Sequence, residues 1–158
     1  MNFKPMLVKP ERKMSEENTL NTLKQGEFGI LSLNCTENGY PYGIPINYVY
    51  FDNNLYFHCG KIGQKLEIIE KNNKACFTMT ADVKVLPEKQ STIYKSVIAF
   101  GKCFIVENDE KEALLLRFGH HFAPKTPQIV SENVKKHSIF ANIIKFEIEY
   151  ISGKQRTE

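Results

Sequence analysis

The residues best suited to chemistry lie in one short segment, between a predicted strand and a predicted helix. This segment contains His58, Cys59, Gly60, Lys61, Gly63, Gln64 and Lys65. Backbone N–H groups in the first turn of a helix have no partner within the helix, so they attract anions. Glycines let an anion approach the backbone, and lysines add positive charge. The segment therefore predicts an anion site, and phosphate is its natural guest.

A hairpin is expected to position this segment. Asp52, Asn53 and Asn54 favour a turn between β-rich runs at 42–51 and 55–59. Pro41 and Pro45 cannot donate to a sheet ladder, so one side of the first run should lack a neighbouring strand. That side would leave main-chain groups free for a ligand, although a plain edge strand remains an alternative. The residues concerned are Ile46, Asn47, Tyr48 and Val49.

The rest of the chain predicts a small α+β protein. An extended arm should cover 1–14, and helices are expected at 15–26, about 62–72 and 109–119, where Gly119 would end the last one. Further strands are expected at 28–35, 75–80, 93–106 (with a bulge at Gly101) and 139–151. The stretches 82–92 and 124–136 are expected to be a loop or interrupted strand and a polar connection with room for a short helix. Six mostly antiparallel strands with short flanking helices favour a small barrel over a doubly wound parallel sheet.

Composition narrows the class of protein. The chain has 158 residues and a formal charge of +3, which suits a single domain and is too small to indicate nucleic-acid binding. It has no apolar run of membrane-spanning length and no signal peptide, so we expect a cytoplasmic protein. Four cysteines without CxxC spacing predict buried thiols, and the adjacent His120 and His121 make a poor metal site.

Four segments together resemble the flavin-binding split-barrel family, which includes pyridoxamine 5'-phosphate oxidase, and especially its nitroimidazole-resistance branch. Residues 12–14 (Arg-Lys-Met) resemble the branch's basic N-terminal motif, and 41–50 resemble its strand beside the flavin ring. Residues 55–66 are similar to its phosphate-binding signature, and 94–101 to its long barrel strand. The resemblance implies a six-stranded split barrel and a homodimer, with two flavin sites at the subunit interface, each lined by both chains.

The resemblance also implies roles for residues. Pro45 to Val49 would border the ring of FMN, or alternatively FAD. Its phosphate would be held by His58, Cys59, Gly60, Gly63, Gln64 and Lys65. Arg12, Tyr94 and Ser96 would complete the cofactor site. His58 is the candidate catalytic residue, because imidazole can donate to a substrate oxygen near neutral pH.

The predicted activity is an oxidoreductase that reduces small electron-poor acceptors such as nitroimidazole-type compounds, with electrons from a reduced nicotinamide. Three alternatives remain open. The chain could be a flavin- or haem-binding module without turnover, with His58 or His121 as haem ligand. It could oxidise pyridoxamine phosphate, although no second phosphate pocket is evident. An RNA-binding barrel has the least support, since the sequence has no clustered basic stripe.

Overall fold

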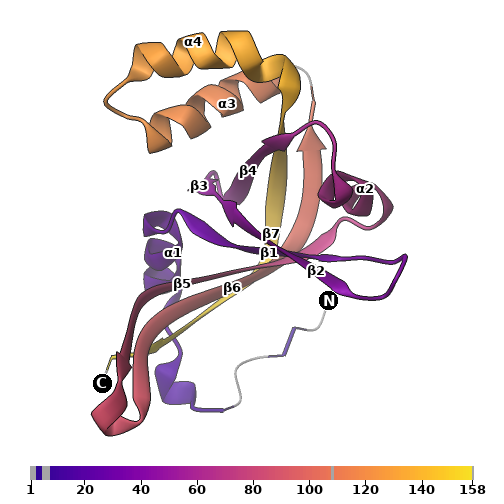
Figure 1. The fold of residues 1–158 in the computed structure, drawn as a ribbon. Helices are drawn as coiled ribbons and strands as arrows, with labels where there is room; N and C mark the ends of the chain where they lie inside the picture. The colour runs from indigo at the N-terminus through magenta and orange to yellow at the C-terminus, as the bar shows by residue number, and fades with distance from the viewer. Residues whose placement is uncertain (1–2, 5–7, 108, 158) are drawn as a thin grey trace.

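The computed structural model of the chain describes residues 3–4, 8–107 and 109–157. In this part of the chain, seven strands form one antiparallel sheet in the order β2-β1-β5-β6-β7-β4-β3 (Figure 1). The strands are β1 (Phe28–Asn34), β2 (Pro41–Asn47), β3 (Val49–Phe51), β4 (Asn54–Gly60), β5 (Lys74–Leu86), β6 (Ser91–Val106) and β7 (Ala141–Arg156). The predicted α+β class is confirmed, and the predicted count of six strands is wrong.

The additional strand arises because the run at 42–51 is broken at Tyr48. Residues before the break pair with β1, whereas those after it pair with β4. Strands β2 and β3 are the two outer strands of the sheet, and Tyr48 alone connects them. The sheet must therefore curl so that its two edges come close together at Tyr48. No β2–β3 pairing closes it into a barrel within the described residues. The prediction that the proline-containing strand has one free side is confirmed, because β2 pairs with β1 alone in the described chain.

The long strands also differ from the prediction. The stretch 82–92 is an interrupted strand and a tight connection: β5 continues to Leu86 past a register shift between Ala81 and Lys84. A 3-10 helix at Pro87–Lys89 then leads into β6. The predicted bulge at Gly101 is confirmed by a register shift between Phe100 and Gly101 against β7. A Cβ atom on Gly101 would overlap the backbone of Glu147, so glycine allows the two strands to approach closely.

Four α-helices occur in the described chain: α1 (Glu16–Gln25), α2 (Gln64–Lys71), α3 (Asp109–Phe122) and α4 (Pro127–His137). Short 3-10 helices lie at Pro10–Arg12 and Ser138–Phe140, so the part of the predicted arm that is described is not wholly extended. Residues 1–2 and 5–7 of that arm lie outside the described residues. Ser15 caps α1 by accepting a hydrogen bond from the N–H of Asn18 at 3.2 Å.

Two helical predictions need correction. Gly119 does not end α3, which continues to Phe122. Its missing side chain instead makes room for Val130, because an added Cβ would lie 2.5 Å from the Val130 Cγ1. The expected polar connection is largely α4, a helix of 11 residues. Helices α3 and α4 lie side by side at one end of the sheet (Figure 1).

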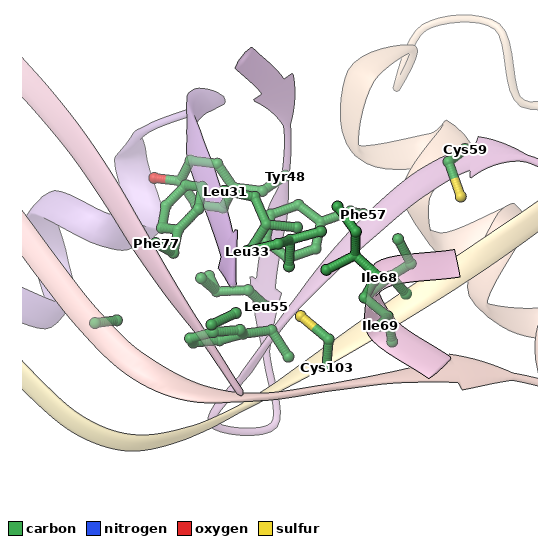
Figure 2. Close-up of a cluster of buried hydrophobic side chains, with 14 of the residues drawn as sticks. Leu31, Leu33, Tyr48, Leu55, Phe57, Cys59, Ile68, Ile69, Phe77 and Cys103 are labelled. Atoms are coloured by element: carbon green, nitrogen blue, oxygen red, sulfur yellow. The ribbon is translucent and has the colours of Figure 1, made fainter. Parts of the chain in front are cut away.

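The main core fills the inside of the curled sheet. Tyr48, Phe57 and Phe77 meet there, and the centroids of the Tyr48 and Phe77 rings are 4.7 Å apart (Figure 2). Ile68 and Ile69 of α2 pack against the same cluster, which fixes this helix beside the end of β4. All four cysteines are free, as predicted; three are buried and Cys76 is partly exposed.

Candidate functional site at the junction of β4 and α2

The turn between β4 and α2 exposes its backbone. Gly63 precedes the first residue of α2 with a φ of 138°, a conformation that residues with side chains rarely adopt. An added Cβ would meet no atom within 4 Å at either Gly60 or Gly63. Small residues are therefore not needed here for packing within the chain, and they leave the backbone open to a ligand.

The start of α2 is electropositive. No side chain caps it, and only the N–H of Leu66 turns back to the Gly63 carbonyl, at 3.0 Å. The N–H groups of Gln64 and Lys65 precede the first intrahelical bonds and can face an anion. The Lys65 ammonium lies near enough to Cys59 to oppose the rise in the pKa of that thiol caused by burial. One lysine charge and the first amides of α2 thus lie near the end of β4, and their binding of a phosphate stays a prediction.

A hollow of about 390 Å³ lies beside β4, where His58 lines it two residues before the strand ends at Gly60. Pro45, Ile46 and Asn47 of β2 line one side, and His58 of β4 lines another. The third side comes from Phe118, Gly119 and Phe122 of α3, and Phe28 completes the lining. The walls are mostly apolar, and the polar groups are an amide and an imidazole. Such a space suits a planar ring with a few hydrogen-bonding atoms.

His58 faces this hollow with an exposed side chain. Its ring lies 5.9 Å from that of Phe118, measured between centroids. The surrounding protein displaces water from one side of the imidazole, and this desolvation lowers the pKa of His58. The neutral ring, which carries one N–H donor and one acceptor, is therefore favoured at neutral pH.

Tyr48 and Val49 do not line the hollow. The Tyr48 hydroxyl donates to the Leu23 carbonyl at 2.7 Å inside the core, where burial raises its pKa. Its N–H donates to the Glu27 carbonyl at 3.0 Å, so this main-chain donor has a partner within the chain. Val49 is buried in the cluster beneath α3. Of the predicted ring-binding stretch, Pro45 to Asn47 meet the hollow.

Cys59 contributes no accessible thiol, because its side chain points into the core. Only the backbone of Cys59, at the end of β4, can contribute to the candidate site.

The remaining candidates lie elsewhere in the chain. Tyr94 and Ser96 sit on the far arm of β6, paired with Arg156 and Lys154 of β7. Arg12 ends the 3-10 helix that precedes α1, next to the Lys13–Lys154 bridge. Figure 1 shows this end of the β6–β7 ribbon at the opposite side of the molecule from α2. A single chain therefore does not bring these three residues to the junction.

Sequence reasoning missed the contribution of α3 to the hollow. Phe118 and Phe122 follow each other at helical spacing, and that spacing is the signal that could have found them. The prediction that Gly119 ends this helix left Phe122 outside it, so the helical spacing was not recognised.

In the described residues, no three His, Cys, Asp or Glu side chains gather so that they could hold a metal ion. Among the helices of the described chain, none has the length and apolar character needed to cross a membrane.

Comparison with solved structures shows what the fold resembles. A candidate 5-nitroimidazole antibiotic resistance protein from Bacteroides thetaiotaomicron is 21% identical, with a TM-score of 0.71 over 90% of this chain and 85% of that one. The FAD and heme binding protein from Mycobacterium smegmatis is 19% identical, with a TM-score of 0.81 over 93% and 74%. A FAD-binding protein from Mesorhizobium loti is 22% identical, with a TM-score of 0.64 over 93% and 97%.

Among curated proteins, none matches this sequence. The protein-family model described as pyridoxamine 5'-phosphate oxidase matches residues 15–155, nearly the whole chain. The chain therefore belongs to the pyridoxamine 5'-phosphate oxidase family.

Proposed function

We propose that this protein binds a flavin, FMN in preference to FAD, and serves as an oxidoreductase for small electron-poor acceptors such as nitroimidazole-type compounds. The observation that carries the proposal is the segment from His58 to Lys65: it begins at an apolar hollow lined by His58 and Asn47, and it ends at the uncapped start of α2 with Lys65. Phosphate and ring sites of this kind are what a flavin nucleotide requires. Structural neighbours whose names include FAD binding support the same reading.

The donors present fit such a cofactor. The amides of Gln64 and Lys65, with the Lys65 ammonium, would hold the phosphate. Pro45 and Ile46 would border the ring. A bound flavin would supply the electron transfer between a reduced nicotinamide and the acceptor.

His58 is proposed as the residue that contacts the acceptor. Its neutral imidazole would donate one hydrogen bond to an acceptor oxygen, and the apolar walls would exclude water around that bond.

A homodimer is part of the proposal, since Arg12, Tyr94 and Ser96 reach a flavin site only if a partner subunit provides them. The outer face of the sheet offers a surface for a second copy. The apolar residues exposed on this face are Phe28, Ile30, Ile98 and Phe100. Ile30 pairs with Thr78, and Thr78 pairs with Ile98, so Ile30 and Ile98 lie in one row across β1, β5 and β6. Apolar side chains gathered on an exposed sheet face are typical of an interface.

Absorbance of protein purified without added cofactor tests the proposal. We expect flavin bands in the visible, and we expect the ligand released by heat to migrate as FMN in chromatography. Colourless protein that also fails to bind added FMN or FAD would refute it.

The same spectrum tests the haem alternative. One specific observation favours that alternative: an exposed histidine, His58, borders an apolar hollow, and one structural neighbour is named as binding both FAD and heme. A Soret band, with or without flavin bands, would support haem binding.

A further inference from the structure

A second cavity, of about 350 Å³, lies between helices α3 and α4 and the adjacent ends of β4 and β7. Each helix faces it with a stripe at helical spacing. The α3 stripe is Leu115, Phe118, Gly119 and Phe122. The α4 stripe is Val130, Asn133, Val134 and His137.

The cavity follows from where the two helices touch. They meet at Gly119 and Val130, where glycine permits close contact. The seam between two packed helices is usually apolar throughout. Here Asn133 and His137, four residues apart on α4, occupy the inward stripe and remain exposed. They place hydrogen-bonding groups around an otherwise apolar space.

This cavity adjoins the hollow proposed for the flavin ring. His58, Phe118, Gly119 and Phe122 line both spaces. The ring centroids of Phe118 and Phe122 are 5.0 Å apart, so an aromatic wall runs along both. A molecule held between α3 and α4 would lie next to the cofactor.

The lining contains no Lys, Arg, Asp or Glu side chain. An ionised phosphate or carboxylate would lose its hydration there without a charged partner, which is unfavourable. A neutral ring would gain from burial against the phenylalanines and could accept hydrogen bonds from His58, Asn133 or His137. The volume is near the lower end of ligand pockets, which suits one or two rings.

We propose that the cavity between α3 and α4 is the acceptor-binding site, and that it selects small, planar, uncharged rings carrying a nitro or carbonyl oxygen. Its role as the acceptor site rests on the proposed flavin function, whereas binding of a neutral ring rests on the cavity alone. Phosphorylated compounds such as pyridoxamine phosphate are excluded by the same lining.

Two probes that share a nitrobenzyl group, one neutral and one carrying an ionised phosphate, test this selection. Calorimetric titration of the purified protein should show binding of 4-nitrobenzyl alcohol and at least tenfold weaker binding of 4-nitrobenzyl phosphate. Ala123→Phe fills a position that lines this cavity and not the flavin hollow, so it should weaken alcohol binding at least tenfold. His137→Ala should weaken it about two- to tenfold, as expected for one lost hydrogen bond.

His120→Ala is the matched control, because His120 is an exposed histidine of α3 that lines neither space. It should leave alcohol binding unchanged. Thermal melts establish whether the variants are folded. If Ala123→Phe is not folded, the affinity of His137→Ala for the alcohol decides the test. The proposal is overturned if the alcohol does not bind, if the phosphate binds equally well, or if the deciding variant binds like the control. Flavin absorbance of the same samples tests the proposed function separately.

Discussion

Lys65 is the residue on which the proposed phosphate recognition depends most. Its side chain is half-buried at the start of α2 and its charge reaches the end of β4. A charge-assisted hydrogen bond contributes about 1.5–3 kcal/mol. Lys65→Ala should therefore weaken FMN binding about ten- to a hundredfold and affect riboflavin, which lacks the phosphate, much less. Fluorescence titration with both ligands measures the difference.

Lys71 provides the control for this test. It lies at the other end of α2, where it forms an ion pair with Glu37 on the surface. Lys71→Ala should leave both affinities unchanged, because exposed ion pairs contribute little. Equal losses of FMN and riboflavin in Lys65→Ala would mean that Lys65 supports the fold instead of the phosphate.

His58 should make stability depend on pH. Burial lowers its pKa in the folded protein below the value of about 6.5 found in unfolded chains. At His58 the unfolded chain therefore binds a proton more readily than the folded protein does. The stability that the neutral His58 ring contributes is fully present above about pH 6.5, and it is lost as the pH falls through the pKa of the folded protein. Relative to His58→Gln, the wild type should lose stability between pH 7.5 and 5.5. If the urea midpoints of wild type and His58→Gln differ by the same amount at every pH in this range, the lowered pKa of His58 is wrong.

At this scale the sequence was informative where chemistry is local. Glycines and lysines at a helix start predict an anion site without any knowledge of the fold, and the structure places Gly63, Gln64 and Lys65 at that start. Tyr48 shows the limit. Its aromatic side chain and its neighbours suit a ligand-facing strand equally well, and its bond to Leu23 depends on packing between segments distant in sequence.

At the scale of elements, the bulge in β6 can be tested directly. A Cβ on Gly101 would overlap the carbonyl oxygen and carbon of Glu147, which belong to the backbone of β7 and cannot move aside cheaply. Gly101→Ala should therefore destabilise the protein by about 1–3 kcal/mol, the usual range for overpacking. Chemical denaturation measures this loss. Gly60→Ala, where an added Cβ meets nothing within 4 Å, should change stability by less than about 0.5 kcal/mol.

The elements that sequence patterns predicted well are those with a clear apolar period. Helix α2 and the strands β1 and β4 have such patterns, and their predicted positions are close to those in the structure. Helix α4 does not, because Asn133 and His137 stand on its inward stripe and Val130 is its buried residue. The sequence pattern did not predict the break at Tyr48 either, because the break arises from tertiary pairing: β2 pairs with β1, whereas β3 pairs with β4.

At the scale of the whole molecule, the proposed dimer has a sharp test. Ile98 is 40% exposed on the outer face of β6, and a carboxylate there would lose its hydration if a second copy covered it. Ile98→Glu should convert the dimer to monomer in light scattering coupled to size exclusion. It should also lower flavin content, because the partner would no longer supply Tyr94, Ser96 and Arg12.

Ile129→Glu is the matched control for the dimer. Ile129 is 55% exposed on α4, away from the sheet face, so the same substitution should leave mass and flavin content unchanged. Wild type that is monomeric with full flavin content would show that one chain completes the site, and the two-chain arrangement would then be wrong. Monomeric Ile98→Glu with full flavin content would separate dimerisation from cofactor binding, and Arg12, Tyr94 and Ser96 would lose their proposed role.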